Sequence, residues 1–406
     1  MKRYYPWLMA ITAMLVLLVS NGLIITGLTA FDESLLKEFG WSRSELKLRD
    51  LITLVLAGWL APFLGVVIDK VGPRRLILAG LALLAALYLA YAHVHSLLHL
   101  YLIHVGFAAV LVAAGLNVAV IYVSQWFVAR RGTAIGIALI GTSLGGMVFP
   151  KLGVGLLQGM DWRSAFLWEA LVPLACLVLA LVLVRSPRPG GIAPWGADQA
   201  GAAVANGPGA NDLGYRQALR TRTFWALAFV AMTTFFSIMA VSANLFLHMR
   251  DLDFTPAQAG NGLALMFGLA MVGKFLFGLL ADLFQAKRVF LLNLAVMAAG
   301  AFLLATMRAD LLWYSLALFG LGWGGLYTMI QLLAVNAFGL GAAGKILGTI
   351  TLLDATTAGI GIWLTAKIFD TTHSYQPAFH LISGLVVLAL LAALLVRNER
   401  ARPSNA

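Results

Sequence analysis

Apolar residues fill long stretches of this chain, and each stretch is about as long as a helix that crosses a membrane. Such a helix needs about 20 consecutive, mostly apolar residues. Twelve stretches meet this requirement: residues 7–30, 44–68, 76–94, 98–126, 133–157, 163–184, 222–247, 256–281, 289–307, 310–338, 345–367 and 376–396. The pattern predicts an all-α membrane protein with 12 transmembrane helices, called spans 1 to 12 below.

The two halves of the chain are similar to each other. Gly65 and Asp69 stand four residues apart at the end of an apolar stretch, and Gly278 and Asp282 repeat this arrangement 213 residues later (278 − 65). Further pairs at nearly the same offset are residues 40–45 with 253–258, 132–136 with 344–348, and 161–166 with 374–379. Two similar halves in an apolar chain are typical of a secondary transporter.

A stretch rich in Gly and Pro separates the two halves. Residues 186–214 contain seven Gly and four Pro and lack apolar periodicity, which is typical of a flexible linker. We therefore predict an N-terminal six-helix bundle at 1–185, a cytoplasmic linker at 186–221 and a C-terminal six-helix bundle at 222–406.

Composition indicates that lipid is the solvent of this chain. Of its 406 residues, 61% are hydrophobic and 11% are charged, whereas about a quarter of the residues in soluble domains are charged. The net charge of +11 does not indicate nucleic acid, because the basic residues stand mainly between spans. The single cysteine, Cys176, cannot form a disulfide or a thiolate metal site. We expect no metal, no cofactor and no nucleic-acid partner.

The positions of Lys and Arg predict the orientation in the membrane. An even number of spans places both termini on one side, and 18 basic residues fall on that side. Seven fall on the other side: Lys37, Arg43, Lys47, Arg49, Arg163, Arg250 and Arg308. Cytoplasmic loops carry the excess of Lys and Arg. We therefore expect a multi-pass protein of a bacterial inner membrane with cytoplasmic N- and C-termini.

Residues 65–75 read Gly-Val-Val-Ile-Asp-Lys-Val-Gly-Pro-Arg-Arg. They resemble the signature loop between spans 2 and 3 of the major facilitator superfamily, and the resemblance to that superfamily extends over essentially the full chain. It implies two pseudo-symmetric six-helix bundles.

A cytoplasmic latch is one hypothesis for this loop. The Asp69 carboxylate at a helix end needs a cation, and Arg130 and Arg131, which follow span 4, are candidates to supply it. The predicted gating residues are Asp69, Arg74, Arg130, Arg131 and Asp282. The alternative is a solvated loop whose charges only set the topology.

Span 5 resembles a particular branch of the superfamily. A basic pair, Arg130-Arg131, precedes an Ala-x-Gly-x-Ala-x-x-Gly-x-Ser-x-Gly run at 134–145 and a later Pro150. This pattern resembles the monocarboxylate transporter and oxalate:formate antiporter branch, as do residues 40–44 and 161–163. The Gly-Pro-Gly-Gly run of drug antiporters is absent from span 5, which disfavours an efflux function.

Two ionisable residues lie deep in predicted spans, where a charge is costly and usually marks a substrate or ion path. They are Lys274 in span 8 and Asp354 in span 11. The branch resemblance implies a span 8 cation that binds the substrate carboxylate, usually an Arg with an Asp four residues earlier. Here these positions hold Lys274 and Ala270, so Asp354 is our candidate partner and proton carrier. The alternative is a static salt bridge within the second half.

Other polar residues in the spans could line the same path, although each is at least as typical of a hydrogen bond between helices. The predicted substrate-binding residues besides Lys274 are Tyr327, Asn117, Tyr122, Asn21 and Ser143. Lys151, Glu169 and Lys367 are expected to be interfacial.

The sequence predicts a proton-coupled symporter that carries a small organic monocarboxylate by alternating access. We expect a transporter rather than an enzyme, which works as a monomer in the bilayer with a small organic anion and a proton as its partners. The alternatives are an exchanger or exporter of a zwitterionic or larger organic molecule and, from another class, a non-transporting membrane sensor.

Overall fold

A computed structural model of the chain describes residues 4–185, 192–196, 213–339 and 342–399, except the side chains of residues 64–66 and 69. Regular structure in these ranges is helical, and only an isolated bridge between Phe127 and Trp195 has β geometry. The chain forms two compact units. Unit 1 comprises residues 1–205 and 254–264, and unit 2 comprises residues 206–253 and 265–406.

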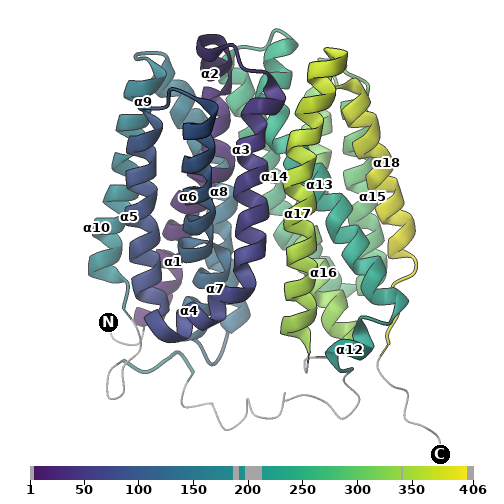
Figure 1. The fold of residues 1–406 in the computed structure, drawn as a ribbon. Helices are drawn as coiled ribbons and strands as arrows, with labels where there is room; N and C mark the ends of the chain where they lie inside the picture. Colours follow the sequence, from purple (N-terminus) through teal and green to yellow (C-terminus); the bar gives the residue numbers. More distant parts are fainter. Residues whose placement is uncertain (1–3, 186–191, 197–212, 340–341, 400–406) are drawn as a thin grey trace, which may run out of the picture. The chain divides into compact units, whose positions relative to one another are not determined.

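The helices follow the predicted spans closely (Figure 1). Those before residue 206 are α1 (Tyr5–Asn21), η2 (Gly22–Thr26), η3 (Gly27–Phe31), α2 (Asp32–Phe39), α3 (Arg43–Leu60), η4 (Ala61–Phe63), α4 (Leu64–Val71), α5 (Pro73–Tyr91), α6 (Leu97–Ala114), α7 (Leu116–Ser124), α8 (Arg131–Leu157), α9 (Trp162–Glu169) and α10 (Leu171–Leu183). Those after it are α12 (Tyr215–Ala218), α13 (Arg222–Asp251), α14 (Pro256–Leu283), α15 (Ala286–Ala305), α16 (Leu312–Phe338), α17 (Ala343–Thr372) and α18 (Gln376–Ala393).

Eleven helical stretches in the described residues are long and apolar enough to cross a membrane, and they cover every predicted span except 44–68. That span is divided into α3, η4 and α4. Pro62 lies in the 3-10 turn η4, and a proline removes a backbone donor and breaks an α-helix. Lys47, Arg49 and Asp50 in α3 also reduce its hydropathy. The second span is therefore present as a broken and unusually charged helix.

The first span is broken as well. Its π-helical segment η2 and 3-10 segment η3 separate α1 from α2, which lies at the end of unit 1 far from the N-terminus (Figure 1). Two side-chain hydroxyls bond carbonyls of the interrupted backbone: Tyr88 of α5 donates to the Leu23 carbonyl at 2.9 Å and Thr26 donates to the Gly22 carbonyl at 3.0 Å. Such π segments are rare and often mark functional sites.

The helix entries confirm that the halves repeat. At the start of α3, the Ser42 hydroxyl accepts from the Glu45 N–H at 3.2 Å, and the Glu45 carboxylate accepts from the Ser42 N–H at 2.8 Å. At the start of α14, Thr255 and Gln258 exchange the same two bonds, at 3.2 and 2.8 Å. Both are reciprocal capping boxes, in which a Ser or Thr is followed three residues later by a Glu or Gln.

Glycines bring α8 against α1. A methyl group added at Gly145 would lie 2.5 Å from the Leu18 carbonyl oxygen and 2.7 Å from the Gly22 Cα, and Gly141 faces the α1 backbone at Met14 and Leu18. The close approach of α8 to α1 is therefore made at Gly141 and Gly145. A methyl group at Gly132 or Gly136 would meet open space.

We expect Gly145→Ala to lower the stability of the protein by about 1–3 kcal/mol, because overpacking displaces the α1 backbone. Gly136→Ala on the same helix is the matched control. It removes a helix-interior glycine without a clash, so stability should stay the same or rise by about 0.5–1 kcal/mol. Thermal unfolding of both variants in detergent tests this; equal effects would contradict the close approach.

Candidate functional site

Three predicted site residues in unit 2 lie at nearly the same depth. The connections between α14, α15, α16 and α17 are short, so the ends of α14 and α16 and the start of α17 lie on one side. From that side, Lys274 is nine residues deep (283 − 274), Tyr327 eleven (338 − 327) and Asp354 eleven (354 − 343). At 1.5 Å per residue these depths are about 14, 17 and 17 Å, which is near the middle of a hydrocarbon core about 30 Å thick.

Close helix packing places Lys274 beside α16. Its neighbour Gly273 faces the α16 backbone, where a methyl group would lie 3.2 Å from the Gly324 Cα. Gly320 and Gly324 in turn face the α14 carbonyls of Met266 and Ala270. Lys274 is thus one helical turn from the level of Tyr327, and its side chain is half-buried. The run of glycines in α16 is required for this approach, because any larger side chain would separate α14 from α16.

Tyr327 connects α16 to α17. Its hydroxyl interacts with the side chains of Thr351 and Gln331 and lies within electrostatic range of the Asp354 carboxylate. Phe235 of α13 packs edge-on against its ring at 5.9 Å between centroids. Sequence reasoning missed Thr351 and Gln331. Their spacing of three from Asp354 and four from Tyr327 is the signal that would have found them, since such residues share a helix face.

Asp354 is buried, with an exposed fraction of 5%. One turn later the Thr357 hydroxyl lies 3.0 Å from the Met232 carbonyl of α13 and 3.0 Å from the carbonyl of Asp354 itself. A buried carboxylate is costly unless it is paired or protonated. Tyr327 therefore lies near a carboxyl group for which uptake of a proton is a direct way to remove this cost.

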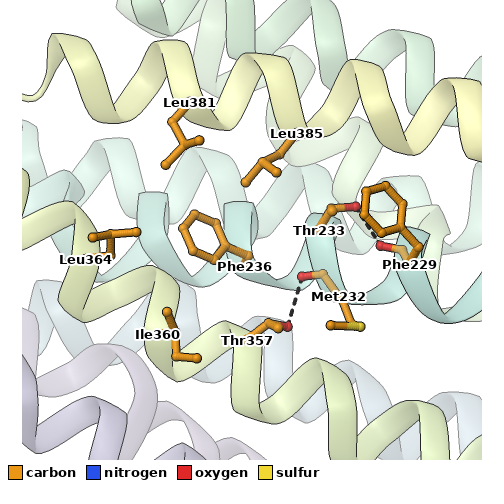
Figure 2. A pocket seen from close by; sticks show the side chains of 9 residues that line it. All are labelled: Phe229, Met232, Thr233, Phe236, Thr357, Ile360, Leu364, Leu381 and Leu385. Atoms are coloured by element: carbon orange, nitrogen blue, oxygen red, sulfur yellow. Dashed lines mark hydrogen bonds between the residues drawn. The ribbon is translucent and has the colours of Figure 1, made fainter.

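A groove lined by residues of α13, α17 and α18 is apolar and is not suited to a charged substrate (Figure 2). Its volume is about 320 Å³, and its lining residues are Phe229, Met232, Thr233, Phe236, Thr357, Ile360, Leu364, Leu381 and Leu385. Its two hydroxyls bond to backbone carbonyls, Thr357 to Met232 and Thr233 to Phe229 at 2.8 Å. The lining therefore offers no cation to a carboxylate.

The predicted site residues of unit 1 have different surroundings. Tyr122 is buried, and its hydroxyl donates to the Arg185 carbonyl at 3.0 Å and accepts from the Arg185 N–H at 3.2 Å. Asn117 is exposed on α7. Asn21 donates to the Ser20 hydroxyl at 3.4 Å, and Ser143 is buried in α8. The Tyr122 hydroxyl thus bonds the backbone of Arg185, and a contact between Tyr122 and substrate stays a prediction.

The sequence of the chain decides its family. Residues 9–362 and 251–406 match the model of the Major Facilitator Superfamily. The chain belongs to the major facilitator superfamily. It is therefore an integral, multi-pass membrane transporter and not an enzyme, as the sequence predicts.

Relatives of this transporter include proteins of the predicted branch. It is 26% identical over 337 residues to monocarboxylate transporter 13 of Bos taurus, with 79% of this chain and 72% of the relative covered. It is 23% identical over 410 residues to the oxalate:formate antiporter of Oxalobacter formigenes, with 98% and 93% covered. The fujikurins efflux protein of Gibberella fujikuroi is 31% identical over only 145 residues, so the match spans 34% of this chain and 31% of that protein.

A solved structure has the same fold. The crystal structure of a D-xylose-proton symporter superposes with a TM-score of 0.75 at 15% identity, and 98% of each chain is covered. At that identity the likeness shows the fold alone.

The predicted latch of the transporter is only partly described. The side chain of Asp69 in α4 lies outside the described residues, so its pairing with Arg130 or Arg131 stays a prediction. Arg74 donates to the Leu181 carbonyl at 3.3 Å, and Arg131 donates to the Phe127 carbonyl at 3.1 Å. The exposed Arg130 caps α8 in the left-handed region with φ 56°. Asp282 is also exposed.

A second charged cluster, which we call the Asp32 cluster, lies in unit 1 of the transporter. It consists of Asp32 in α2, Lys47, Arg49 and Asp50 in α3, and Tyr91 in α5. Lys47 is 2.5 Å from one Asp32 oxygen and Arg49 bonds the other. The side chains of all three have no exposed surface. Asp50 lies 3.7 Å from Lys47 and 3.6 Å from Arg49, and Arg49 donates to the Tyr91 hydroxyl at 2.7 Å.

Buried charges in unit 1 correct two sequence expectations. Lys47 and Arg49 were counted among the basic residues that set the orientation in the membrane, but both are fully buried inside α3. Glu169 is not interfacial, because it is fully buried and neither carboxylate oxygen has a hydrogen-bond partner in the part of the chain that the structure describes. In both cases the apolar residues predicted the span correctly, but the burial of its charged residues was not predicted.

Residues 161–166 secure the C-terminal end of α2. Asp161 caps α9 by accepting from the Ser164 N–H at 2.7 Å, and hydrogen bonds from Ser164 lower the pKa of the Asp161 carboxyl. Trp162 and Arg163 then donate to the carboxylate of Glu38 in α2, with Arg163 at 2.6 Å. The predicted motif therefore ties α9 to α2.

Proposed function

We propose that the transporter is a proton-coupled symporter of a small organic monocarboxylate. One observation carries this proposal: Lys274, Tyr327 and Asp354 stand about 14–17 Å from the same side of unit 2 on adjoining helices. A lysine supplies a point charge for one carboxylate. A buried aspartate beside a tyrosine supplies a group that gains and loses a proton. The monocarboxylate and oxalate:formate relatives support the substrate class.

The two charges couple substrate to proton through electrostatics. When Asp354 is charged, it competes with the substrate carboxylate for the positive potential of Lys274. When Asp354 is protonated, that competition ends and an organic anion can bind Lys274 with Tyr327 as a hydrogen-bond donor. Release of the proton on the other side restores the negative charge and weakens binding of the substrate. Proton and anion therefore move together, and alternating access supplies the change of side.

The roles of other predicted residues follow from this scheme. Asn21 and Ser143 of unit 1, together with Asn117 and Tyr122, are proposed to complete the substrate path. Asp69, Arg74, Arg130, Arg131 and Asp282 are proposed to gate its cytoplasmic end, with both termini in the cytoplasm. The bundles are proposed to be residues 1–185 and 222–406, joined by the linker 186–221, in a monomer of a bacterial inner membrane.

Asp354→Asn tests the coupling. In proteoliposomes with an inward proton gradient, the native protein should accumulate a labelled monocarboxylate, and the variant should not, because asparagine cannot carry the proton. Exchange of substrate across the membrane without a gradient should survive in the variant. Asp370→Asn, near the opposite end of α17, is the control and should accumulate substrate normally. Accumulation by Asp354→Asn would contradict the proposed proton site.

A second candidate function is exchange or export of a zwitterion. It is favoured by the similar depths of Lys274 and Asp354, since a cation and a carboxylate could each hold one end of such a molecule, and one partial relative is named an efflux protein. Substrate counterflow that is independent of pH would favour this function over symport.

A further inference from the structure

The Asp32 cluster has no counterpart in the second half of the chain. The 213-residue offset equates Asp32, Lys47 and Arg49 with Leu245, Gly260 and Gly262. Leu245 lies in α13, which is one continuous α-helix, whereas Asp32 begins α2 directly after the π and 3-10 segments. The buried charges therefore accompany the broken helix. The fold itself does not require them, since the second half forms its helices without them.

The short helix α2 needs an anchor. It has eight residues, and its buried positions are Asp32 and Leu35. A helix of this length is not stable by itself, and one buried leucine contributes little apolar area. The tie at its far end, between Glu38 and Arg163, is partly exposed, with side chains 40% and 32% accessible. Asp32 thus makes fully buried ion pairs that hold the start of α2 in place.

The partners of Asp32 are arranged as a carboxylate site. Each of its two oxygens contacts a different cation, Lys47 or Arg49. Two cations placed in this way can bind both oxygens of one carboxylate. Neither cation depends on Asp32 for its position. Arg49 is held by the Tyr91 hydroxyl and by Asp50, and Lys47 lies near Asp50 in the next helical turn. The site should therefore persist when the Asp32 side chain is removed.

We propose that Lys47 and Arg49 form a carboxylate-binding site whose occupant is Asp32 of the same chain, and that this internal ligand clamps α2 to the rest of unit 1. The site recognises a single carboxylate by charge and by one oxygen for each cation. A small free carboxylate should therefore replace the missing side chain in a variant that lacks it. This proposal does not depend on the transport site in unit 2.

Chemical rescue of Asp32→Gly tests the carboxylate site. The variant should unfold at a lower temperature than the native protein, and sodium formate should raise its unfolding temperature by several degrees more than it raises that of the native protein. Formamide, which has a similar size and no charge, should not. Rescue should disappear in Asp32→Gly/Arg49→Met and persist in Asp32→Gly/Lys274→Ala. An equal response to formate and formamide, or loss of rescue with Lys274→Ala, would overturn the proposal.

Glu38→Gly is the matched control, because it removes an exposed carboxylate from the same helix. Formate should give it no more stabilisation than the native protein, and an equal rescue would overturn the assignment to Lys47 and Arg49. If Asp32→Gly does not fold, Asp32→Asn allows a second measurement. Amide hydrogen exchange in α2 should then be at least tenfold faster than in the native protein, whereas exchange in α1 should not change. Unchanged exchange in α2 would overturn the clamp.

Discussion

Lys274→Ala is expected to reduce uptake of a monocarboxylate by about a hundredfold. Removal of one partner from a buried charge pair costs about 3–5 kcal/mol, and each 1.4 kcal/mol is a factor of ten in affinity. Even the lower limit, about 3 kcal/mol, gives roughly a hundredfold loss. The measurement is initial uptake of a labelled monocarboxylate into proteoliposomes at a substrate concentration below saturation.

Two further variants separate the charge of Lys274 from its effect on folding. Lys367→Ala removes an exposed lysine from α17 in the same unit and should leave uptake unchanged. Lys274→Arg keeps the positive charge with a different shape, so it should retain part of the uptake. Normal uptake by Lys274→Ala would exclude it as the carboxylate-binding residue. Equal loss in Lys274→Ala and Lys367→Ala would indicate a general defect of the unit.

The span order and the capping boxes can be predicted from the sequence because they depend on local patterns. Apolar length and the Ser42–Glu45 spacing need no knowledge of the partners. The depth of Lys274 and Asp354 was also predictable, since a helix converts position in the sequence into distance along its axis. The surroundings of Tyr327 could not be predicted, because Thr351 lies on another helix and tertiary packing determines how closely α16 approaches α17.

The Asp32 cluster was missed for a related reason. Lys47 and Arg49 stand near the start of a span, and at a helix end the sequence alone cannot distinguish a cation in water from a cation buried against another helix. Asp32 stands near the end of the preceding span, where the continuous apolar pattern did not reveal the break at η2 and η3. Only the folded chain brings the three residues together. The missing counterparts in the second half, Leu245 among them, were a signal available in the sequence.

Asp32→Asn is expected to lower the free energy of unfolding by about 3–5 kcal/mol. The change leaves Lys47 and Arg49 buried with only Asp50 as a carboxylate partner, and an uncompensated buried charge has a cost of that size. Glu38→Gln is the matched control on the same helix. Its ion pair with Arg163 is partly exposed, and such pairs contribute about 0–1 kcal/mol. Unfolding of both variants by denaturant in a mild detergent gives the comparison.

The apolar variant Asp32→Leu/Lys47→Met/Arg49→Leu separates the cost of breaking the cluster from its net contribution. Well-packed apolar residues often replace a buried ion pair with no loss of stability, and the second half of this chain already has Leu245 at the position of Asp32. The triple variant should therefore be more stable than Asp32→Asn. If it is less stable, the charges themselves stabilise unit 1. If its stability matches that of the native protein but its transport is slower, the cluster positions α2 during transport and does not stabilise the fold.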